Sequence, residues 1–185
     1  MIKKLYSCLL VGFLLSLAFI ACSRPADTLR SEIIPVSTHS FTRGEVTEML
    51  ITNYFNINGL HLTDGRYIAP EKTWVESIFT EKMSKFLFDH NLNHWIKESW
   101  DCDKITRTSA CYAGILFHNS SNRIKGHGFL VGEFYYLKTG KGGHAINICI
   151  VKDGKDYRIM FYEPQLKYEV TLTQEEKFSA FMIKF

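Results

Sequence analysis

The sequence predicts an α+β fold in which N-terminal helices pack on a small antiparallel sheet. Apolar residues recur at helical spacing between residues 70 and 87, and a second helical pattern begins near Ile105. Between residues 143 and 163, two apolar runs flank Asp153-Gly154, which is the strongest short-range signal for a hairpin. The 185 residues, 46% of them hydrophobic, are enough for one domain with a substantial core.

The first 21 residues are expected to be a targeting signal rather than part of the fold. Lys3 and Lys4 precede an uninterrupted apolar run, which is short for a membrane span. Residue 22 is a cysteine that follows a small residue, as in a bacterial lipobox. We therefore expect Cys22 to be lipidated and to anchor the protein in the cell envelope, at the outer membrane if the cell is Gram-negative. A plain secreted protein and an uncleaved anchor are the alternatives.

Composition divides the remainder into a flexible tether, residues 22–40, and one domain, residues 41–185. Removing Lys3 and Lys4 from the 22 basic residues leaves 20, against 19 acidic residues, so the mature chain has a net charge of +1. This balance gives no reason to expect nucleic acid as a partner.

Within the domain, the elements are expected in a clear order. A helix begins near Thr42 and ends at Gly59, and a second helix of roughly 18 residues follows Pro70. Its apolar stripe is expected to face the core. After the helix near residue 105, both faces of the segment 129–138 are apolar, so it should be a central strand. A short strand and a helix capped by Thr173 end the chain.

The hairpin predicts a pair of functional side chains. With Asp153-Gly154 as the two loop residues, Lys152 faces Lys155. Counting the same number of residues along both strands then places His144 opposite Glu163. A carboxylate at that distance can orient the imidazole as a base. His127 is a rival base, but no acid is placed to orient it.

Cys102 is the candidate nucleophile. It lies at the first turn of the predicted helix, where unpaired N–H groups and the helix dipole favour a thiolate. Cys111 and Cys149 are expected to fill the core. A cysteine at a helix N-terminus, with a histidine and an acid on neighbouring strands, is the papain-like arrangement.

Three short motifs carry a family resemblance: Asp101-Cys102-Asp103, the strand 143–147, and the segment 161–165. They resemble the C-terminal peptidase domain of the Marasmius oreades agglutinin and its bacterial and phage relatives. The resemblance covers roughly residues 64–165. It implies a papain-like cysteine peptidase fold with a triad of Cys102, His144 and Glu163.

The resemblance also bears on cofactors. It requires no organic cofactor, but some members of the family need calcium, for which Asp101 and Asp103 are possible ligands. Lys104 departs from the family pattern, which commonly has a further acid there.

The expected activity is hydrolysis of a peptide or amide bond in a peptide or protein, with Cys102 attacking the carbonyl carbon. One alternative is a cell-wall (peptidoglycan) endopeptidase with the same triad. Another is a non-catalytic envelope lipoprotein that uses the fold as a binding module. Candidates for the substrate groove or for an oxyanion donor are Asn93, Trp100 and Gln165. His90 and His94 are expected to be surface residues rather than metal ligands.

Overall fold

The computed structural model describes residues 32–53, 59–94, 96 and 101–185. The expected signal segment, Cys22 and Trp100 lie outside these residues. The fold occupies the compact unit Ile33–Phe185. Its first strand begins within the expected tether, so residues 36–40 belong to the sheet rather than to a linker. Among the described residues, no helix has both the length and the apolar character needed to cross a membrane.

The described residues form two sheets. The first, of three strands, contains β1 (Val36–Thr42), β3 (Arg66–Pro70) and β4 (Gly128–Phe129), in that order. The second, of six strands, has the order β2-β9-β5-β6-β7-β8. These strands are β2 (Leu60–His61), β9 (Met182–Lys184), β5 (Val131–Lys138), β6 (Gly142–Asp153), β7 (Asp156–Glu163) and β8 (Tyr168–Val170).

This architecture corrects the expected fold class. Instead of N-terminal helices on one small antiparallel sheet, the described part of the chain has nine strands in two mixed sheets. The parallel pairs are β3 with β4 and β2 with β9. Three of these four strands are two or three residues long, too short to show an alternating pattern in the sequence. They are strands only because distant segments pair with them.

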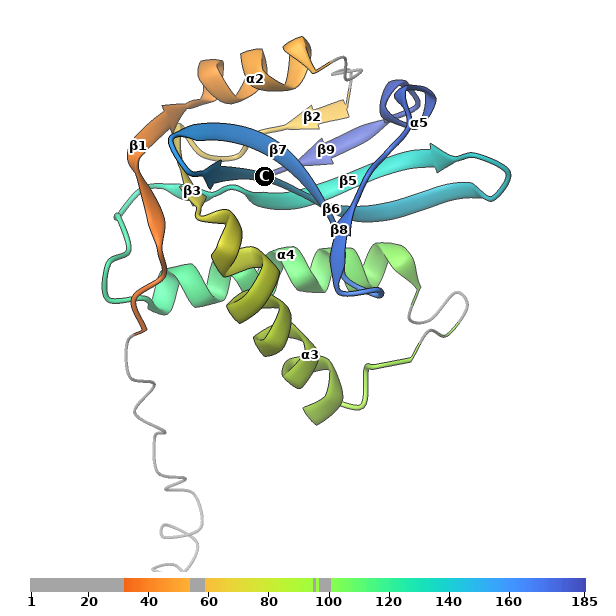
Figure 1. Cartoon of the computed structure of the whole chain (residues 1–185), viewed down its shortest axis with the longest axis horizontal. Helices are drawn as coiled ribbons and strands as arrows, with labels where there is room; N and C mark the ends of the chain where they lie inside the picture. The colour runs from red at the N-terminus through yellow and green to blue at the C-terminus, as the bar shows by residue number, and fades with distance from the viewer. Residues whose placement is uncertain (1–31, 54–58, 95, 97–100) are drawn as a thin grey trace, which may run out of the picture. The chain divides into compact units, whose positions relative to one another are not determined.

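Helices cover both faces of the six-stranded sheet (Figure 1). On one face, Ile146, Ile148 and Ile150 of β6 pack against α2. On the other, Cys149 and Val151 pack against the remaining long helices. The helices are α2 (Arg43–Thr52), the π-helix η2 (Trp74–Phe79), α3 (Thr80–Asp89), α4 (Cys102–Asn119) and α5 (Gln174–Phe178). The expected central strand is confirmed, since β5 pairs with both β6 and β9.

The β6–β7 hairpin forms, but its predicted register is wrong by two residues. Asp153 pairs with Asp156, so the two loop residues are Gly154 and Lys155. Gly154 has a φ of 64° and Lys155 has no positive φ, which matches a type II′ turn rather than type I′. Because side chains alternate with period two, this shift moves no side chain to the opposite face.

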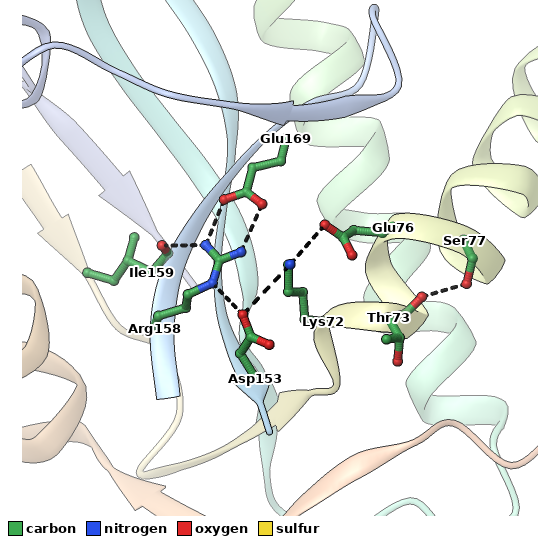
Figure 2. A network of polar contacts seen from close by, with 8 residues as sticks. All are labelled: Lys72, Thr73, Glu76, Ser77, Asp153, Arg158, Ile159 and Glu169. Carbon is green, nitrogen blue, oxygen red and sulfur yellow. Dashed lines mark hydrogen bonds and ion pairs between the residues drawn. The ribbon is translucent and has the colours of Figure 1, made fainter. Parts of the chain in front are cut away.

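An ion network explains why Asp153 remains in the strand (Figure 2). Arg158 donates to Asp153 Oδ2 at 2.9 Å and binds the Glu169 carboxylate on β8 at 2.6 and 2.8 Å. Lys72, just before η2, lies 3.7 Å from Asp153 and 3.4 Å from Glu76. The network therefore ties the turn of the hairpin to β8 and to the start of η2.

Candidate functional site

The structure brings His144 and Glu163 together at the end of the hairpin. His144 Nε2 lies 2.7 Å from Glu163 Oε2, and the two side chains are only 17% and 4% exposed. The other carboxylate oxygen, Oε1, accepts a hydrogen bond from the backbone N–H of Gln165 at 3.2 Å. The carboxylate is therefore held at both oxygens, and it fixes the orientation of the imidazole.

Tyr136 supports the imidazole from the neighbouring strand. It pairs with His144 in the β5–β6 ladder, and the two rings meet edge to face with centroids 5.7 Å apart. Tyr136 is almost fully buried. His144 is thus packed on one side and hydrogen-bonded on another.

Cys102 completes the constellation. It is the first residue of α4 and is half-buried. Its sulfur hydrogen-bonds the His144 side chain and accepts a hydrogen bond from the backbone N–H of Ala145. Since Glu163 holds Nε2 of the imidazole, Nδ1 is the ring nitrogen left to interact with the thiol. The order of the hydrogen-bonded chain is therefore sulfur, imidazole, carboxylate.

Asn147 places α4 against the sheet so that Cys102 reaches His144. Its buried side-chain amide donates to Thr106 O on α4 at 3.0 Å and to Gly132 O on β5 at 2.9 Å. β7 pairs with β6 only as far as Asn147, so the first residues of β6 have no β7 neighbour. Ala145, in this part of β6 that pairs with β5 but not with β7, is the residue whose N–H contacts Cys102.

The contacts shift the titration of both groups. The hydrogen bond with His144 lowers the pKa of Cys102, against the effect of burial and with help from the Ala145 N–H. Burial alone would lower the pKa of His144, but the hydrogen bonds with Cys102 and Glu163 outweigh it and raise the pKa to about 9. Near neutral pH the two groups therefore favour a thiolate beside an imidazolium. Such a thiolate is a nucleophile, and the imidazolium beside it is a proton donor.

The other two cysteines differ from Cys102. Burial raises the pKa of Cys149, which makes its thiol unreactive. Cys111 is exposed rather than a core filler, so that expectation is wrong.

The buried face of α4 consists of Ile105, Thr106, Ser109, Ala113 and Phe117. Ile115 of the same helix is 55% exposed and lies outside this face.

The acids that flank Cys102 both pair with Lys104. Lys104 Nζ lies 3.0 Å from Asp101 Oδ1 and 3.6 Å from Asp103 Oδ1. The ammonium group therefore lies within ion-pairing distance of both carboxylates. In the described residues there is no group of three or more histidine, cysteine or acidic side chains that could hold a metal.

Two of the three expected groove residues line the same cavity. Asn93 and Gln165 both line this cavity, which has a volume of about 270 Å³. Asn93 is exposed and its amide oxygen contacts His94, whereas Gln165 contacts the triad through its backbone. The cavity also has apolar walls that the sequence analysis did not identify: Leu87, Leu92, Ile105, Pro164 and Leu166. They come from three separate segments, so no local pattern reveals them.

Comparison with known proteins yields matches only among solved structures. No family model and no curated protein matches the chain. One matching structure, "PSL1a-E64 complex", is 21% identical with a TM-score of 0.60 and covers 79% of this chain. Another is Polyporus squamosus lectin bound to the human-type influenza-binding epitope Neu5Acα2-6Galβ1-4GlcNAc, with 21% identity, a TM-score of 0.58 and 79% coverage. The chain spans about half the length of each, 50% and 49%.

These matches correct the identification drawn from the motifs. Both structures are of a lectin, and neither is named as a peptidase. The chain is therefore not identified as a papain-like cysteine peptidase, a hydrolase or a thiol protease. Its fold is similar to that of a lectin structure. The expected peptide, protein and cell-wall peptide partners are corrected as well, because the second of these structures holds a sialylated glycan epitope. At 21% identity the likeness concerns the fold alone.

Proposed function

We propose that this protein is a ligand-binding domain that captures an electrophilic ligand covalently through Cys102. The observation that supports this proposal is the hydrogen-bonded chain of Cys102, His144 and Glu163, with its lowered thiol pKa. A thiolate held beside an imidazolium reacts with electrophilic carbon, whereas a buried neutral thiol such as Cys149 does not.

The capture step can be written for an epoxide, since one of the matching structures is a complex with E64, a compound that has an epoxide ring. The Cys102 thiolate attacks one ring carbon, so a C–S bond forms and a C–O bond breaks. The released alkoxide takes the proton from the His144 imidazolium, which becomes neutral. Glu163 keeps its charge throughout and holds the imidazole in place.

Covalent capture is tested with E64 on the full chain, followed by intact-mass measurement and peptide mapping. One adduct is expected, at Cys102, and it should be lost in Cys102→Ser and slowed in His144→Ala. Cys111→Ser is the matched control and should react like the parent protein. An adduct at Cys111, or no adduct, would contradict the proposal.

Glycan binding is a second candidate, favoured by the sialylated epitope bound to the other matching structure. The match covers 49% of that lectin chain, so a glycan site in this protein has to be tested directly. Calorimetry with Neu5Acα2-6Galβ1-4GlcNAc tests this candidate. Saturable binding that persists after Cys102 has been alkylated would support a glycan site separate from the thiol.

We also propose that the protein is lipid-anchored in the bacterial cell envelope. This proposal rests on the sequence of residues 1–22 alone, where two lysines and an apolar run precede Cys22.

A further inference from the structure

The 270 Å³ cavity is lined in part by residues that lie close to triad residues in the chain. Ile105, one of its lining residues, follows Cys102 by one helical turn on α4. Side chains three positions apart on a helix are neighbours, with Cβ atoms about 5–6 Å apart. Pro164 and Gln165, which directly follow Glu163, form the opposite wall. The cavity is therefore lined by a residue one helical turn from Cys102 and by the residues that follow Glu163.

The turn that forms this opposite wall is held by Glu163 itself. Its carboxylate accepts from the backbone of Gln165, and its backbone carbonyl accepts from the N–H of Leu166 at 3.2 Å and of Lys167 at 2.7 Å. Lys167 has a φ of 66°, a left-handed conformation that closes the turn. The wall thus keeps a fixed position relative to the site.

The third wall comes from the end of α3. The backbone N–H of Leu92 bonds to Leu87 O at 2.7 Å, and Asn91 between them has a φ of 57°. This tight reversal brings Leu92 back toward Leu87, and both line the cavity. The position of the cavity is therefore set by backbone hydrogen bonds rather than by mobile side chains.

The chemistry of the walls selects an apolar group. Leucine, isoleucine and proline side chains from all three segments line the cavity. Leu166 is 53% exposed although it lines a concave site, so a ligand group placed there removes apolar surface from water. The polar half of the lining consists of Ser84, Asn93, His94, Gln165 and Lys167. Apolar walls combined with polar groups that fix the orientation of a ligand are typical of a small-molecule site.

We propose that this cavity binds an apolar side group of the ligand, aromatic or branched aliphatic, while Cys102 attacks an electrophilic carbon next to that group. A cavity of about 150 Å³ accommodates a benzene ring, so 270 Å³ accepts a benzyl group with room to spare. This inference rests on the proposed function and names the class of ligand that the reactive thiol captures.

The experiment compares iodoacetamides that differ only in the group on nitrogen: unsubstituted, N-(2-hydroxyethyl) and N-benzyl. The rate of adduct formation at Cys102 is measured on the full chain by mass spectrometry and divided by the rate of each reagent with glutathione. The N-benzyl reagent is expected to exceed the other two by about tenfold, because a benzyl group buries apolar surface in the cavity.

Two variants assign this preference to the cavity. Leu166→Ser removes an exposed apolar wall, and Ser84→Phe fills space that Ser84 lines. Each should reduce the N-benzyl preference to about twofold while leaving the rate of unsubstituted iodoacetamide unchanged. Ile115→Ser is the matched control, because Ile115 is equally exposed but lies outside the cavity lining. It should retain the full preference.

The outcomes separate the two proposals. If Cys102 reacts with iodoacetamide no faster than Cys111, the reactive thiol itself is contradicted. If Cys102 reacts fast but shows no N-benzyl preference, or if Ile115→Ser loses the preference as Leu166→Ser does, only the cavity inference is overturned.

Discussion

His144 and Glu163 are joined by a 2.7 Å hydrogen bond although they are not opposite one another in the sheet. The β6–β7 ladder ends at Asn147 and Tyr162, and continuing it by one residue places Ile146 opposite Glu163. His144 is therefore the diagonal neighbour of Glu163 on the same face. Diagonal neighbours lie about 7–8 Å apart, which long side chains span. A histidine and a glutamate are long enough, and the pair forms.

This pair predicts the effect of removing the carboxylate charge. Glu163→Gln should slow alkylation of Cys102 by about tenfold near pH 6.5, because losing the orienting charge lowers the pKa of His144 and weakens the thiolate. The measurement is the rate of iodoacetamide incorporation at Cys102. Glu175→Gln, an exposed acid on α5, is a suitable control. Glu169 is not, because it binds Arg158. An unchanged rate in Glu163→Gln would show that the carboxylate does not act on the thiol.

The pH dependence of alkylation follows from the two pKa shifts. The contacts of Cys102 favour its thiolate, so its reaction rate should reach half-maximum below about pH 8.5, the pKa of a free cysteine. The imidazolium should persist until the pH approaches about 9, the pKa of His144. Burial raises the pKa of the Cys102 thiol, and in His144→Ala the imidazole that opposes this effect is missing. The pH at half-maximal alkylation should therefore move above about 8.5. A midpoint for the parent protein at or above that of His144→Ala would contradict the ion pair.

Asn147 should stabilise the fold as well as position α4. Asn147→Ala removes two buried hydrogen bonds and leaves the carbonyls of Thr106 and Gly132 without this donor. The expected loss is about 2–3 kcal/mol in the free energy of unfolding, measured with urea. Asn119→Ala, at the exposed end of α4, should change it by less than about 0.5 kcal/mol. Equal effects of the two substitutions would rule out the role of Asn147.

The ion network of Figure 2 should make the hairpin acid-sensitive. Contacts with Arg158 lower the pKa of Asp153 and Glu169 in the folded state. The two carboxylates therefore contribute to the free energy of unfolding above about pH 4, the pKa of an acid in the unfolded chain. This contribution is lost as the pH falls through their lower pKa values in the folded state. Arg158→Ala should destabilise the protein by about 1 kcal/mol at pH 7, since Arg158 and Glu169 are about one-third exposed, and by less at pH 3.

Lys85→Ala is the control for this network. Its exposed pair with Asp89 should contribute almost nothing at either pH. If Arg158→Ala destabilises the protein equally at pH 3 and pH 7, the charges are not the source of its effect.

The envelope anchor predicts a change in fractionation. Cys22→Ser should release the protein from membranes or leave it as an unprocessed precursor, as judged by membrane fractionation and gel mobility. A variant that fractionates and migrates like the parent protein would contradict lipidation at Cys22.

The amino-acid sequence by itself determined the features that depend on neighbouring residues. The helix start at Cys102 and the cap of Thr173 by Glu176 are local, so they were predicted correctly. The shared face of His144 and Glu163 was also predicted correctly. Side chains alternate between the two faces of a strand, so a register error of two residues leaves each side chain on its original face. The reversal itself was local too, since a glycine with positive φ is needed at the turn.

Only the tertiary structure decided which distant segments meet. The turn shifted because Asp153 in the strand binds Arg158 and Lys72, contacts that no local pattern contains. The short strands β2, β4 and β9 exist through their partners, and the cavity beside Cys102 combines the end of α3, the start of α4 and the turn after Glu163. Such contacts form between residues far apart in sequence, and the free energy that selects them belongs to the packed core rather than to any single segment.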